Sequence, residues 1–83
     1  MKELTNKMMG KRLGEVLTIL KADGVKLENI EWDDNNTPLE KLLALPEENE
    51  DRQTANLHIG GYWIGEHLVI GFWDGVVDTV YYT

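Results

Sequence analysis

The side chains that could carry out chemistry in this chain are few. Its 83 residues include two histidines, His58 and His67, and neither cysteine nor serine. The nucleophile of a covalent mechanism would therefore have to be a threonine, a lysine or a carboxylate, and no threonine has a basic partner at a recognisable spacing. The sequence predicts no catalytic residue, and we expect a protein that is not an enzyme.

A metal or cofactor site is not indicated either. The strand register predicted below separates His58 from His67 by several rows, about 20 Å at roughly 3.3 Å per residue. An EF-hand loop that began at Asp33 would need glycine at its sixth position, where Pro38 stands. No glycine-rich segment is followed by the helix and lysine of a phosphate-binding loop. We expect no metal and no cofactor.

Charge divides the chain into three parts. Residues 1–27 are net positive, residues 28–51 carry nine of the fifteen acidic residues against Lys41 alone, and nothing basic follows Arg52. The acidic surface predicted from this pattern consists of Glu31, Asp33, Asp34, Glu47, Glu48, Glu50 and Asp51.

Composition excludes several classes of protein. The formal net charge of −7 opposes direct contact with nucleic acid or an anionic membrane. No apolar run approaches the roughly 18 residues of a membrane span, and the N-terminus lacks the apolar stretch of a signal peptide. A hydrophobic fraction of 42% is typical of a globular chain. We expect one small domain over residues 1–83, located in the cytoplasm.

Two helices are predicted in the first two thirds of the chain. Apolar residues recur at helical spacing from Met9 to Leu20, and Gly24 is placed to end that helix. A second helix has Thr37 as its N-cap, Pro38 in its first turn and Glu40 completing a capping box. Residues 26–32 are a candidate extra strand, and residues 47–54 are predicted to be a polar loop.

The last third predicts three antiparallel strands. Asp74-Gly75 is a strong hairpin signal between two apolar runs, and Gly65-Glu66 fits a second two-residue turn. The expected class is α+β, with two helices packed on one face of a three-stranded, or with residues 26–32 four-stranded, antiparallel meander.

The two turns together predict a register and hence two faces of the sheet. The expected core face comprises Leu57, Ile59, Gly61, Trp63, Leu68, Ile70, Phe72, Val77, Thr79 and Tyr81. The opposite face would expose an apolar and aromatic patch of Tyr62, Ile64, Val69, Trp73, Val76, Val80 and Tyr82, with Gly60 and Gly71 forming a shallow trough at its centre.

Soluble monomers rarely expose a contiguous apolar patch this large. The acidic middle segment, a second copy of the chain or another protein could cover it. We expect a non-catalytic interaction module that homodimerises or binds a partner protein through this face.

Two other functions stay open. The acidic segment could dock on a basic cleft of a target, even one that normally holds nucleic acid, as a small inhibitor or antitoxin-like protein of the phage type does. The glycine trough could hold a small molecule, although few polar groups converge there.

Overall fold

The computed structural model of the chain describes residues 7–33, 37–63 and 66–83, apart from the side chains of residues 37 and 61–66. Within these ranges the regular elements, in chain order, are α2 (Leu13–Ala22), the short 3₁₀ helix η1 (Leu27–Asn29), β1 (Ile30–Trp32), β2 (Thr37–Pro38), α3 (Leu39–Leu43), α4 (Glu50–Gln53), β3 (Asn56–Trp63), β4 (Glu66–Trp73) and β5 (Val76–Tyr82).

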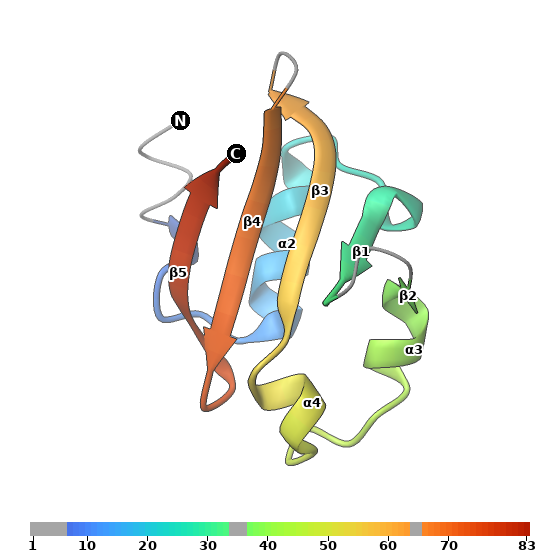
Figure 1. Cartoon of the computed structure of the whole chain (residues 1–83), viewed down its shortest axis with the longest axis vertical. Helices are drawn as coiled ribbons and strands as arrows, with labels where there is room; N and C mark the ends of the chain where they lie inside the picture. The colour runs from blue at the N-terminus through green and yellow to red at the C-terminus, as the bar shows by residue number, and fades with distance from the viewer. Residues whose placement is uncertain (1–6, 34–36, 64–65) are drawn as a thin grey trace.

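The strands form one antiparallel sheet in the order β2-β1-β3-β4-β5. α2 lies across one side of β3 and β4, α3 lies beside β2, and α4 lies below the start of β3 (Figure 1). The predicted α+β class and the C-terminal meander are confirmed, and the sheet continues beyond the meander through β1 and β2.

The first helix begins at Leu13, later than the apolar pattern suggests. Gly10 has a φ of +77°, a left-handed value that favours glycine and interrupts the helix. At the start of α2 the Glu15 carboxylate accepts a hydrogen bond of 3.3 Å from the backbone N–H of Arg12, satisfying one free amide of the first turn. The helix ends before Gly24, whose φ is +90°, as predicted.

The predicted start of the second helix is wrong. Thr37 and Pro38 form β2, which pairs with β1, so α3 begins at Leu39. Its N-cap position belongs to Pro38, whose side chain has no polar atom with which to close a capping box with Glu40.

The predicted polar loop over residues 47–54 contains α4. Asn49 is the N-cap of this helix, and its side chain accepts a hydrogen bond of 2.9 Å from the backbone N–H of Asp51. Glu50 and Asp51 occupy the first turn, where negative charge favours a helix. The asparagine followed by two acids is the sequence signal that could have identified the helix.

The candidate strand within residues 26–32 is real but short. Ile30 pairs with Ile59 and Trp32 with Leu57, so Ile30 and Trp32 share the core side of the sheet. The Trp32 indole N–H donates a hydrogen bond of 3.0 Å to the carbonyl of Pro38, which ties β1 to β2.

The predicted register between β3 and β4 is wrong by four residues. Ile59 pairs with Leu68 rather than with Phe72, and the hairpin closes with Trp63 opposite Glu66. Two residues of this offset arise at the turn, because Glu66 begins β4 instead of lying in the predicted turn, and an irregularity in β3 between Ile59 and Trp63 adds the other two. Because the offset is even, the paired residues of β3 and β4 keep their predicted faces.

The register between β4 and β5 contains a bulge, which changes faces. Phe72 pairs with Val77 as predicted, but Gly71 pairs with Thr79, so Asp78 is an extra residue in β5. The one-residue shift moves every later side chain of β5 to the opposite face. The predicted core positions Thr79 and Tyr81 are therefore wrong, and Val80 and Tyr82 pack against the core in their place.

One hydrophobic core lies between the sheet and the helices. α2 contributes Leu13, Val16, Leu17 and Leu20, and α3 contributes Leu39 and Leu42, so both predicted helices reach it. Before α2, Met8 is buried whereas Met9 is 43% exposed, so the predicted place of Met9 in the apolar stripe is wrong.

None of the helices in the described ranges has the length and apolar character to cross a membrane.

The bulge predicts different roles for two adjacent tyrosines. Tyr82→Ala is expected to lower the free energy of unfolding by about 2 kcal/mol, because it removes a ring packed against the core. Tyr81→Ala is expected to change it by less than about 0.5 kcal/mol, because that side chain is 49% exposed. Urea denaturation followed by circular dichroism measures both, and the reverse order of the two effects would contradict the bulge.

Candidate functional site

The side of the sheet opposite α2 is exposed, and we call it the open face. No described helix lies over β3, β4 and β5 on this side, which faces the viewer in Figure 1. Strand pairing and alternation assign to it Glu31, Asn56, His58, Gly60, His67, Val69, Gly71, Trp73, Val76, Thr79 and Tyr81. The interaction patch predicted from the sequence lies on this side of the sheet.

The open face retains part of the predicted patch. Trp73 is 66% exposed and lies opposite half-buried Val76 across the β4–β5 hairpin. Val69 lies between His58 and Tyr81 on one cross-strand row and is only 3% exposed. Trp73 is therefore the large apolar side chain most available to a partner.

Two predicted members of the patch are wrong and two are not described. The Asp78 bulge turns Val80 and Tyr82 toward the core. Ile64 and the side chain of Tyr62 lie outside the described residues. Tyr81, which sequence analysis placed in the core, joins the open face, and no local signal in the sequence announces the bulge that moves it.

The predicted glycine trough is also wrong. Gly71 pairs with Asn56, whereas Gly60 lies against the ring of His67, so the two glycines are not adjacent. A Cβ at Gly60 would lie 3.3 Å from His67 Cε1, and a Cβ at Gly71 would lie 3.0 Å from Asn56 Oδ1. Neighbouring side chains already fill the space over both glycines, which removes the observation behind the small-molecule hypothesis.

The two histidines are closer than the predicted register implied. His58 pairs with Val69, and His67 stands two residues before Val69 on the same face, so the histidines are diagonal neighbours. Glu31 lies directly across from His58 on β1. Among residues 7–33, 37–63 and 66–83, however, no three His, Cys, Asp or Glu side chains are grouped so that they could hold a metal ion.

A hollow beside Trp73 has carboxylates on its wall. Glu50, Gln53 and Thr54 from the α4 region and Trp73 and Asp74 from the hairpin line a volume of about 310 Å³. Glu50 and Asp74 are both exposed. The sequence did not predict this hollow, in which the acidic segment lies beside the exposed Trp73. It was missed because helix α4, which places the acidic segment there, was not predicted.

The remaining members of the predicted acidic surface are dispersed. Asp33 is engaged in structure, because its carboxylate accepts a hydrogen bond of 3.3 Å from the Asn56 backbone N–H. Glu47 and Glu48 are exposed in the turn before α4, and Asp51 lies in the first turn of that helix. Asp34 lies outside the described residues.

The three long strands of the open face contain no lysine or arginine. No lysine or arginine follows Arg52 in the sequence, so β3, β4 and β5 carry no permanent cation. Arg52 itself donates a hydrogen bond of 2.8 Å from Nη1 to the carbonyl of Leu45. Cations do lie at the β4–β5 hairpin, because Arg12 forms a bridge with Val76 and lines a hollow together with Arg52 and Asp74.

Comparison of the chain with protein-family models, with curated proteins and with solved structures finds no match.

A double-mutant cycle tests the observed register at Gly71. Gly71→Ala is expected to destabilise the protein by about 1 kcal/mol, because the added methyl group meets Asn56 Oδ1 at 3.0 Å and Thr79 Cβ at 3.4 Å. In the Asn56→Ala background the cost should fall by about half or more. Additive effects in thermal denaturation would contradict the Gly71–Asn56 pairing.

Proposed function

We propose that this protein is a non-catalytic interaction module that binds a basic protein through the open face, with Trp73 at the centre of the contact. The observation that carries the proposal is the two-thirds exposed indole of Trp73 beside a hollow lined by Glu50 and Asp74. A cysteine-free chain does not depend on an oxidising compartment, and we place its activity in the cytoplasm.

The chemistry of this surface matches a partner with exposed lysine or arginine. An aromatic face attracts a cation through its quadrupole, most strongly when the ring is that of tryptophan. Carboxylates beside the ring supply charge-assisted hydrogen bonds to the same cation. Trp, Tyr and Arg are the residue types most enriched at interface hot spots, and this surface offers the first two.

Self-association is supported less well by the same features. A symmetric dimer through the open face would bring the carboxylates of two chains together without a lysine or arginine from the sheet between them. The bulge also withdraws Val80 and Tyr82 from the apolar area that a homodimer would bury. Neither obstacle applies to a basic partner protein. Such partners include proteins whose basic cleft normally holds nucleic acid.

Substitution of Trp73 is the direct test of this function. Affinity capture from cell extract is carried out with wild-type protein, Trp73→Ala and Met9→Ala, and the bound proteins are quantified by mass spectrometry. We expect one or more basic proteins whose recovery falls at least tenfold with Trp73→Ala, because a hot-spot aromatic contributes about 2 kcal/mol or more. Their retention should also fall as salt is raised.

Met9→Ala is the matched control, because Met9 is a large apolar side chain that is 43% exposed outside the sheet. It should capture the same proteins as the wild type. Circular dichroism must show that Trp73→Ala is folded. Equal capture by a folded Trp73→Ala, or Trp73-dependent proteins that are acidic, would contradict the proposal.

Solution mass separates a basic partner from self-association. Light scattering at micromolar concentration is expected to give the 9.5 kDa of one chain. A mass of twice that value that reverts to one chain in Trp73→Ala would assign the open face to a second copy and contradict the proposed partner.

A further inference from the structure

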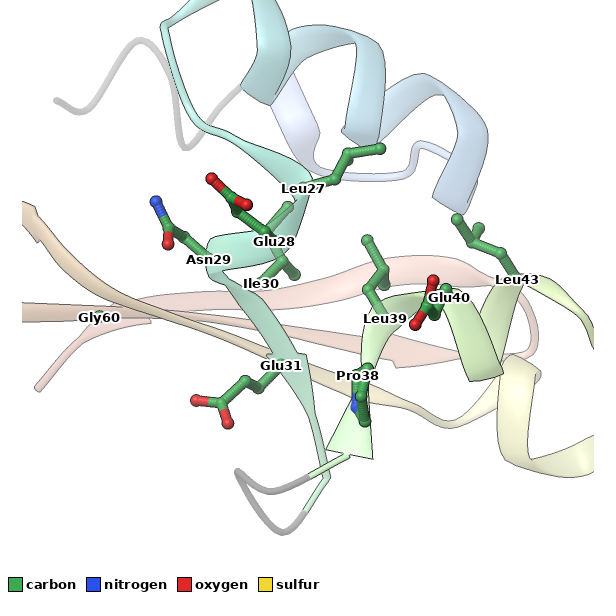
Figure 2. A pocket seen from close by; sticks show the side chains of 10 residues that line it. All are labelled: Leu27, Glu28, Asn29, Ile30, Glu31, Pro38, Leu39, Glu40, Leu43 and Gly60. Atoms are coloured by element: carbon green, nitrogen blue, oxygen red, sulfur yellow. The ribbon is translucent and has the colours of Figure 1, made fainter.

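A groove with a volume of about 630 Å³ runs along β1. η1 and β1 form one wall, and β2 and α3 form the other. In Figure 2, Glu28 stands on the η1 side, Glu40 and Leu43 stand on the α3 side, and Ile30 and Leu39 lie between them.

The floor of the groove is apolar and firmly packed. Ile30 and Leu39 are 1% and 3% exposed and belong to the hydrophobic core, so the floor is part of the rigid body of the fold. Leu43 at the rim is 36% exposed and offers further apolar surface to an occupant. Small-ligand sites commonly fall between about 300 and 1,000 Å³, so the hollow is large enough to hold several side chains.

The rim of the groove is acidic. Among the described residues that line it, Glu28, Glu31 and Glu40 carry exposed carboxylates and none is lysine or arginine. The nearest basic residue along the first wall, Lys26, lines a smaller adjoining hollow together with Asp23. An apolar floor beneath an acidic rim suits side chains with an aliphatic stem and a cationic head, since the stem packs while the head stays at the carboxylates.

The groove is continuous with the open face through Glu31. Glu31 lines the groove and also begins the cross-strand row that runs through His58 and Val69 to Tyr81. A chain segment that leaves a partner seated on the open face can therefore enter the groove at Glu31 without crossing a helix.

We propose that this groove binds an extended segment of the partner that carries arginine or lysine beside leucine-like side chains. The inference rests on the proposed function for the identity of the partner. Binding in the groove can nevertheless be tested separately from binding at the open face, because Trp73 is not among the residues that line the groove. The apolar side chains lie over Ile30 and Leu39, and the cations pair with Glu28 and Glu40.

Fluorescence polarisation with a defined peptide tests the groove alone. The probe is a fluorescein-labelled peptide with three arginines and two leucines between glycines. One comparison peptide replaces arginine by citrulline, which is neutral and nearly isosteric, and another replaces leucine by serine. We expect the original peptide to bind at least tenfold more tightly than either comparison peptide.

The protein variants locate the binding site. Glu28→Gln/Glu40→Gln is expected to weaken peptide binding about tenfold. Glu47→Gln/Glu48→Gln removes the same charge from exposed positions outside the groove and should weaken it less than twofold. Leu43→Ser is expected to weaken binding without changing its salt dependence.

Several results would overturn the inference. These are no binding of the peptide up to millimolar concentration, equal binding of the citrulline peptide, or equal losses in the two double variants. A dimer that Glu28→Gln/Glu40→Gln dissociates would assign the groove to a second copy and overturn it as well. Because Trp73 is intact in every protein used here, failure of the groove and failure of the open face are distinguishable.

Discussion

The extra residue in β5 controls what the sheet buries and what it exposes. Side chains alternate along a strand, so the insertion of Asp78 between the Val77 and Thr79 pairs reverses the direction of every later side chain. Val80 and Tyr82 thereby add apolar volume to the core of a domain small enough to need it. The same reversal leaves Thr79 and Tyr81 outside, so one residue determines both the extent of the core and the chemistry of the open face.

The acidic middle segment supplies both structural contacts and exposed charge. Negative charge in the first turn favours α4, and it is this helix that brings Glu50 beside Trp73. The carboxylate of Asp33 holds the Asn56 amide where β1 meets β3. Glu31 and Glu40 instead project from elements whose other side chains fill the core, so their charge remains available at the surface. The negative charge of the surface therefore comes from the acidic residues whose carboxylates project into solvent.

Several structural features that depend on residues close together in the sequence were predicted correctly. The Asp74-Gly75 hairpin, the end of α2 at Gly24 and the alternation along β4 all follow from local backbone preference and apolar spacing. The bulge at Asp78 and the four-residue offset of β3 were not readable, because competing registers satisfy the same turn signals and differ only in long-range packing. The exposure of Trp73 could be anticipated from the alternation along β4, whereas its acidic surroundings and the groove required the three-dimensional arrangement of α3, α4 and β1.

The outer edge of β5 is closed by the beginning of the described chain. The Gly10 N–H donates to the Val77 carbonyl, the Val77 N–H donates to the Lys11 carbonyl, each at 2.9 Å, and Arg12 forms a bridge with Val76. Contacts between segments so distant in sequence form late, because the intervening chain must first be ordered. Until these contacts form, the outer edge of β5 presents unpaired N–H and C=O groups that can pair with a strand of another chain. The segment before α2 thus protects the sheet against edge-to-edge aggregation.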